Sequence, residues 1–216
     1  MTHMFRTVAL AALAALTVTS ATQAAVIVSA SANDTPLPAN QTLVYDFDGL
    51  SAVGYNLAYA GAVGVFDGSD GLHPNLAAPP PGTESNYLAI QQGGSATLTT
   101  PTALSRLSVY IGSPDSFNSI RFIGLNGFDV TLNGADLAAG AFNGDQSVGR
   151  RMTYSFGSDR VTQVIFSSSG NSFELDNIAV SAVPEPATWA MMIAGFGMLG
   201  AALRGRRTAA VAYARI

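Results

Sequence analysis

The sequence predicts an all-β fold class, a jelly-roll-like β-sandwich between an N-terminal signal peptide and a C-terminal transmembrane helix. Three observations predict this organisation. The middle of the chain consists of short strand-forming stretches separated by turn residues. It contains no convincing amphipathic helix of about ten residues or more. Both ends are apolar segments with the composition of targeting signals.

The N-terminal segment, residues 1–24, has the features of a secretory signal peptide. Arg6 provides the charged start, residues 8–18 form an apolar run, and small residues lead up to Ala24. We therefore expect signal peptidase to cleave between Ala24 and Ala25. An uncleaved anchor or a buried helix is the alternative, but the run is too short for a permanent membrane span.

The C-terminal segment contains an uncharged stretch over residues 187–203, followed by an arginine cluster. As a helix this stretch is about 25 Å long, near the minimum for a hydrocarbon core of about 30 Å. Trp189 is placed like an interfacial residue, and arginines favour the cytoplasmic side. The sequence thus predicts a transmembrane helix that tethers an external domain, followed by a short cytoplasmic tail over 208–216. The cluster consists of Arg204, Arg206 and Arg207.

A proline pair precedes this helix. Pro184 and Pro186 flank Glu185, and Trp189 and Ala190 follow. Each proline lacks an amide donor and disfavours helix in the residue before it, so we expect an extended segment just outside the membrane. An extended segment suits the cleft of a transpeptidase. A helix that simply begins after proline is the alternative.

Taken in order, the Pro-Glu-Pro motif, the Trp-Ala pair, the apolar span and the arginines resemble the PEP-CTERM sorting signal in its Pro-Glu-Pro-x-x-Trp-Ala form. The resemblance covers residues 184–207. It implies processing by an exosortase, a membrane cysteine transpeptidase of bacteria that secrete exopolysaccharide. It also implies a precursor in the inner membrane and a final location at the cell surface or in the extracellular matrix. The tail over 208–216 departs from the family, whose members usually end soon after the arginines.

The domain between the two signals, residues 25–183, has about 160 residues and is long enough for one hydrophobic core. It holds five arginines, no lysine and thirteen acids, hence a net charge of −8. Such a charge excludes a nucleic-acid partner and suits divalent cations. The chain has no cysteine, which excludes disulfides and thiolate metal sites.

Nine strands are predicted in this domain, and the turn-rich stretch over 67–85 is predicted to be an exposed loop. The predicted strands are 43–48, 62–66, 86–90, 95–99, 104–111, 119–123, 128–132, 160–166 and 172–181. No internal repeat is evident, which argues against a solenoid or a propeller. The stretch 173–180 resembles the closing strand of exported jelly-roll and carbohydrate-binding modules, and 110–122 resembles a segment of exosortase-dependent surface proteins.

Two pairs of acids form a candidate calcium site. Asp46 and Asp48 share one face of the first predicted strand, as Glu174 and Asp176 do on the last. If these strands pair, four carboxylates converge, and hard oxygen ligands favour a structural Ca²⁺. The alternative is that these acids cap turns or face water.

The last predicted strand also contains a break in its apolar alternation. Phe173 and Leu175 fall on one face, whereas Ile178 and Val180 fall on the other. A β-bulge at 176–177 would bring both pairs to the core and re-aim the carboxylate that it carries.

We expect a structural or interaction role without catalysis. Only His73 remains after signal cleavage, and the only glutamates of the domain are Glu84 and Glu174, so a secreted glycoside hydrolase is a weak second alternative. The first alternative is a lectin-like module for exopolysaccharide, whose aromatic side chains would stack on sugar rings. The candidate platform residues are Tyr55, Tyr59, Tyr87, Tyr110 and Tyr154. Ice binding is disfavoured because the threonine run at 97–102 is short.

Overall fold

A computed structural model describes residues 25–32, 34, 36–73, 76–138, 149–183 and 186–213. The predicted signal peptide with Ala24 lies outside these residues, as do Pro184 and Glu185 of the predicted sorting signal. The side chains of Arg206 and Arg207 are also outside the described part.

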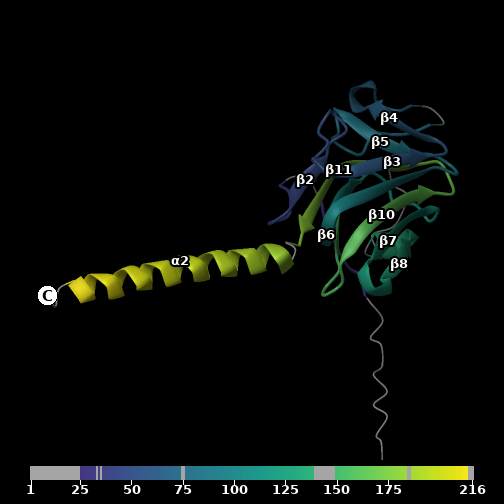
Figure 1. Ribbon diagram of the computed structural model, residues 1–216. Helices are drawn as coiled ribbons and strands as arrows, with labels where there is room; N and C mark the ends of the chain where they lie inside the picture. Colours follow the sequence, from purple (N-terminus) through teal and green to yellow (C-terminus); the bar gives the residue numbers. More distant parts are fainter. Residues whose placement is uncertain are drawn as a thin grey trace, which may run out of the picture.

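Strands dominate the described residues, which confirms the all-β prediction (Figure 1). The strands are β1 (Ile27–Ser31), β2 (Thr42–Tyr45), β3 (Asn56–Ala60), β4 (Val63–Asp67), β5 (Asn86–Ile90), β6 (Ser95–Ile111), β7 (Asn118–Gly124), β8 (Asp129–Asn133), β9 (Arg150–Ser155), β10 (Val161–Ser168) and β11 (Phe173–Ala182). The helices are η1 (Gly68–Asp70), η2 (Leu125–Gly127), α1 (Gly134–Leu137) and α2 (Pro186–Tyr213).

Strand β6 organises the sheet because its two halves pair with different neighbours. The first half, up to Thr99, lies between β3 and β10. The second half, from Leu104, lies between β9 and β11. From β10 the sheet continues through β7 to β8; β11 leads to β5 and β4 and also pairs with β2, and β9 pairs with β1. The strands therefore form two groups that share β6 (Figure 1).

Aromatic side chains from the two groups of strands meet in one core. Phe122 on β7 lies 5.2 Å, centroid to centroid, from Tyr154 on β9. Phe166 on β10 lies edge-on to Phe173 on β11 at 6.5 Å. All four rings are fully buried, and burial of a side chain of this size contributes about 1.5–3 kcal/mol. The two groups therefore pack face to face as a sandwich, while the finer jelly-roll assignment stays a prediction.

The predicted strands match observed ones with two kinds of difference. The predicted strands 95–99 and 104–111 form one continuous strand, β6. The sequence pattern does not predict β1, β3 or β9. Strand β9 begins with Arg150 and Arg151, and two adjacent charges are typical of an exposed segment, yet Arg151 is only 1% exposed.

The predicted bulge in the last strand is confirmed. The register between β11 and β6 shifts between Asp176 and Ala179, and Asn177 adopts a left-handed conformation with φ 49°. The expected pairing of β2 with β11 is present as well. The apolar pairs on both sides of the bulge reach the core; they are Phe173 and Leu175, and Ile178 and Val180. One inserted residue thus changes the side-chain parity of the strand.

Helix α2 contains the predicted helix over 187–203 and is longer than predicted. It begins at Pro186, a residue favoured in the first helical turn, and ends at Tyr213. Trp189 is 53% exposed and Phe196 is 68% exposed, and Figure 1 shows the helix leading away from the strands. None of the described helices is both long enough and apolar enough to cross a membrane. The predicted membrane span over 187–203 is therefore not confirmed.

Candidate functional site

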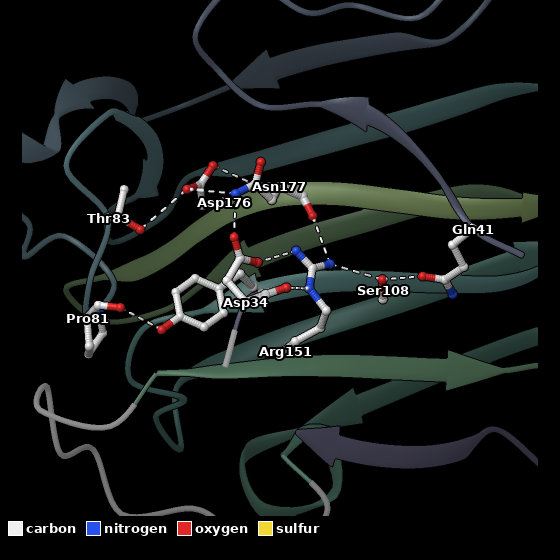
Figure 2. A network of polar contacts seen from close by, with 9 residues as sticks. Asp34, Gln41, Pro81, Thr83, Ser108, Arg151, Asp176 and Asn177 are labelled. Atoms are coloured by element: carbon white, nitrogen blue, oxygen red, sulfur yellow. Dashed lines mark hydrogen bonds and ion pairs between the residues drawn. The ribbon is translucent and has the colours of Figure 1, made fainter. Parts of the chain in front are cut away.

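A buried arginine holds together the polar network drawn in Figure 2. Arg151, on β9, is 1% exposed. Its Nε donates to the main-chain carbonyl of Asp34 over 2.7 Å, and its Nη2 forms an ion pair with the Asp34 carboxylate. Its Nη1 donates to Oγ of Ser108 at 3.0 Å and to the carbonyl of Asn177 at 3.1 Å. The buried charge is thus both paired and hydrogen-bonded, as burial of a charge requires.

The bulge in β11 joins this network through Asn177. Its Nδ2 donates to Oδ2 of Asp34 at 2.6 Å and to Oδ2 of Asp176 at 3.3 Å. Asparagine tolerates the left-handed backbone better than most residues, which explains its place in the bulge. The contacts tie the segment around Asp34 to β9 and β11.

Asp176 is the buried acid of the network that has no arginine partner. It is 2% exposed, and its Oδ1 accepts a hydrogen bond from the Asn177 amide at 2.7 Å. Its Oδ2 accepts one from Oγ1 of Thr83 at 3.3 Å. Burial, followed by the nearby charges of Asp34 and Asp48, raises the pKa of Asp176 to about 7, against the lowering effect of its hydrogen bonds. Near neutral pH this carboxyl group therefore both accepts and donates protons.

Asp176 lines a polar cavity of about 280 Å³. Asp34, Thr83, Glu84 and Tyr110 are among its other lining residues. The hydroxyl of Tyr110 donates to the carbonyl of Pro81 over 2.6 Å, which fixes the loop before β5 against β6. The cavity can exchange hydrogen bonds with a small polar group. Of the two glutamates in the predicted domain, Glu84 lies here, and Glu174 is not among the lining residues.

The first pair of predicted calcium ligands caps turns instead. Strand β2 ends at Tyr45, so Asp46 and Asp48 lie in the turn that follows it. Oδ1 of Asp46 accepts hydrogen bonds from the amides of Asp48 and Leu50, both at 2.9 Å. Oδ1 of Asp48 accepts one from the amide of Asn86 at 2.8 Å. Backbone amides thus occupy these oxygens, as is common for aspartate in turns.

The four carboxylates of the predicted calcium site do not form one cluster among the described residues. Glu174 is 3% exposed; it accepts hydrogen bonds from Oγ of Ser172 and from the amide of Ala78, and burial raises its pKa. Asp176 lines the polar cavity and is hydrogen-bonded to Asn177 of the Arg151 network. Among the described residues, which include all four acids, no group of three or more histidines or acids could hold a metal ion.

The five-tyrosine platform is also not present as predicted. Tyr87, Tyr110 and Tyr154 are buried, whereas Tyr59 is 48% exposed and Tyr55 is half-buried. A smaller aromatic cluster does exist around the end of β2 and β3. Tyr45 stacks on Phe47 at 6.4 Å, and its hydroxyl donates to the carbonyl of Tyr55 at 3.1 Å. The pKa of Tyr59 is raised by burial and by the nearby hydroxyl of Tyr45. We call Tyr45, Phe47, Tyr55 and Tyr59 the aromatic cluster.

Sequence reasoning missed Arg151, Asp34 and Thr83. Once β9 is known to be a strand, alternation shows that Arg150 and Arg151 face opposite sides, but it does not show which of them is buried. No local pattern marks Asp34, whose partner lies 117 positions away.

The β-domain is similar to solved structures only at a distance. A family 11 carbohydrate-binding module from Clostridium thermocellum, in complex with a mixed-linked tetrasaccharide, shares 13% identity and a TM-score of 0.35, covering 67% of this chain and 97% of the module. CsCBM6-3 from Clostridium stercorarium, in complex with cellobiose, shares 14% identity and a TM-score of 0.32, covering 56% and 94%. Similarity this distant assigns neither a ligand nor an activity.

A Bacillus subtilis arabinoxylan arabinofuranohydrolase of glycoside hydrolase family 43 is similar over only 28% of its own length. It shares 16% identity and a TM-score of 0.34, and the match covers 60% of this chain. No curated protein matches the sequence.

One family model matches the C-terminal end of the chain. It is described as the PEP-CTERM protein-sorting motif, and it matches residues 182–207. This range contains the Pro-Glu-Pro motif, Trp189, Ala190 and the arginine cluster, in the order expected from the sequence. The chain therefore carries a PEP-CTERM protein-sorting motif directly after the last strand of its β-domain.

Proposed function

We propose that this chain is an exported surface or matrix protein that an exosortase processes at its C-terminus. In this proposal, signal peptidase removes residues 1–24, the β-domain over 25–183 is the mature protein, and residues 184–207 are the sorting signal. The β-domain has a structural or interaction role outside the cell and no catalysis of its own. Exopolysaccharide is its proposed neighbour there.

The sorting motif at residues 182–207 carries this proposal. It starts at the last residue of β11, so the fold is complete where the motif begins. The amide of Val183 donates to the carbonyl of Ala103 over 2.8 Å and fixes this end of the chain to β6. The described large apolar side chains of α2 are exposed. Removal of the segment would therefore leave the domain's core intact.

Cell fractionation tests the sorting proposal. The triple variant P184A/E185A/P186A removes the motif without changing the β-domain. We expect wild-type protein at the cell surface or in the matrix, and the variant in the inner-membrane or periplasmic fraction. The matched control, T208A/V211A, changes two residues beyond the matched range and should leave the distribution unchanged. Equal distribution of wild type and triple variant would contradict the proposal.

The absence of catalysis is tested separately at the cavity. Asp34, Glu84 and Asp176 line the same cavity, and Asp34 is paired with Arg151, so Glu84 and Asp176 are the candidate pair for glycoside hydrolysis. We nevertheless expect no turnover, because hydrogen bonds from Asn177 and Thr83 engage both oxygens of Asp176. The assay measures reducing ends released from polysaccharides by wild type and by the D176N variant. Release of reducing ends by wild type but not by D176N would contradict the proposed absence of catalysis.

A lectin-like role is the second candidate function, and the aromatic cluster favours it. Tyr59 is 48% exposed and lies near the hydroxyl of Tyr45, so its ring is a candidate for stacking on a sugar. We expect Y59A to weaken retention on neutral polysaccharide in affinity electrophoresis, and V65A, at a comparably exposed site, to have no effect. Equal mobility of wild type and Y59A would remove this candidate.

A further inference from the structure

A second, larger groove lies beside β1. Its volume is about 720 Å³, and strands β1, β6 and β9 line one side. Thr153 and Ser155 alternate along β9 with the buried Met152 and Tyr154, so the lining side chains point away from the core. Ser29 lies opposite Thr153 in the pairing of β1 with β9. The floor of the groove is therefore rich in hydroxyl groups.

Arg106 provides the only charge among the described lining residues. It lies opposite Ser155 on β9 and opposite Ser181 on β11, so its neighbour on each adjacent strand carries a hydroxyl group. The lining also includes Pro36, Leu37 and Pro38. None of the described residues that line the groove is an acid, although the predicted domain contains thirteen acids and five arginines. The described lining thus has a positive charge on an acidic domain.

The guanidinium of Arg106 has no partner among the described residues. Arg121 pairs with Asp129, and Arg151 pairs with Asp34. Arg160 donates to three main-chain carbonyls around the turn before β10. Arg106, by contrast, is exposed and forms no hydrogen bond or ion pair with the described part of the chain. Its planar fork of donors is free to bind a carboxylate through two parallel hydrogen bonds.

We propose that this groove binds a polysaccharide that carries carboxylate groups. Arg106 would hold a carboxylate, and Ser29, Thr153 and Ser155 would exchange hydrogen bonds with sugar hydroxyls. The proline-flanked Leu37 would pack against the C–H face of a ring. The inference deepens the proposed function, because it names the chemical class of the exopolysaccharide that the mature protein would contact.

The composition of the groove favours an acidic polysaccharide over other polyanions. A single cation among hydroxyls matches a ligand in which one carboxylate accompanies many hydroxyl groups. Nucleic acid carries a phosphate at every nucleotide and would meet a domain of net charge −8, which repels a dense polyanion. A volume of about 720 Å³ lies within the usual range of ligand sites, about 300–1,000 Å³. The groove therefore has room for part of a saccharide chain.

Isothermal titration calorimetry of the full chain with polygalacturonate oligomers tests the site. The comparison ligand is the same oligomer with fully methyl-esterified carboxyl groups. We expect R106Q to weaken binding of the acidic oligomer at least about tenfold, as the loss of a charge-assisted pair would. The affinity of R106K should lie between those of wild type and R106Q, because lysine keeps the charge but lacks the planar guanidinium fork. The matched control is R121Q, which removes one charge from an exposed strand residue elsewhere.

Three results would overturn the site: no binding by wild type, equal binding of the acidic and esterified oligomers, or equal losses in R106Q and R121Q. Circular dichroism confirms that each variant is folded. The titration needs no exosortase, so its failure leaves the sorting proposal unchanged. Failure of the fractionation experiment, in turn, leaves a measured affinity unchanged.

Discussion

Nε of Arg151 donates a hydrogen bond to the main-chain carbonyl of Asp34 over 2.7 Å, joining residues 117 positions apart. The same arginine forms an ion pair with the Asp34 carboxylate, while Asn177 donates to the other carboxylate oxygen. Asp34, which lies between β1 and β2 in the sequence, is thus held against β9 and the bulge of β11. These contacts fix Asp34 and Asn177, which line the polar cavity.

D34A should lower the free energy of unfolding by about 3–5 kcal/mol, because it leaves the buried Arg151 charge without its counter-ion. Urea denaturation measures the change. The matched control is D129A, which breaks the exposed pair with Arg121 and should lower the free energy of unfolding far less. Equal effects of the two substitutions would contradict the structural role assigned to Arg151.

The stability of the domain should depend on the ionisation of Asp176. The unfolded carboxyl ionises near pH 4 and the folded one near pH 7, so between these values the unfolded state binds fewer protons. The contribution of Asp176 is therefore full below about pH 4 and is lost as the pH rises through about 7. A pKa shift of this size corresponds to a change of at most about 4 kcal/mol in the free energy of unfolding.

D176N should remove the pH-dependent contribution of Asp176 to stability. Thermal unfolding of wild type and D176N between pH 4 and pH 8 measures that contribution. The difference in stability between variant and wild type should shift in favour of the variant as the pH rises. D129N is the control, because Arg121 lowers the pKa of Asp129 and that contribution is lost only below about pH 4, so its stability difference from wild type should stay constant between pH 4 and pH 8. Parallel pH profiles for wild type and D176N would show that Asp176 ionises as in the unfolded chain.

Asn177 stabilises the bulge through both its backbone and its side chain. N177G keeps access to the left-handed conformation but loses the hydrogen bonds to Asp34 and Asp176. N177A loses these bonds and also strains the backbone, so it should be less stable than N177G by about 1 kcal/mol. Chemical denaturation of the two variants gives the difference. A more stable N177A would contradict the assigned conformation.

Gly149 should be intolerant of a side chain. A Cβ atom there would lie 2.0 Å from the hydroxyl oxygen of Tyr110, which must then leave the carbonyl of Pro81. We expect G149A to lower the free energy of unfolding by about 1–3 kcal/mol. G195A, in α2, has open space around the added atom and should leave the domain unchanged. The same denaturation assay compares them.

Local patterns in the sequence predicted the bulge and the strands other than β1, β3 and β9, because both depend on the alternation of neighbouring side chains. The parity change between Leu175 and Ile178 required an inserted residue, and the structure contains it. The burial of Arg151 was not predictable in this way, since it depends on Asp34, which is remote in sequence. A buried charge becomes tolerable only when such a partner is in place.

The separation of the four predicted calcium ligands has a related reason. Spacing on a strand shows that two acids can share a face, but it does not show whether backbone amides already occupy their oxygens. Asp46 and Asp48 lie beyond the end of β2 and accept hydrogen bonds from amides. The sorting motif, by contrast, is a linear sequence feature, so the sequence alone was sufficient to identify it.

The intact mass of the exported protein tests the central claim most directly. It is measured in cells that have their exosortase and in cells from which the exosortase gene is deleted. We predict that the product from normal cells begins at Ala25 and lacks Arg204 and all later residues, whereas cells without the exosortase retain them. A product from normal cells that still carries residues 204–216 would contradict the account.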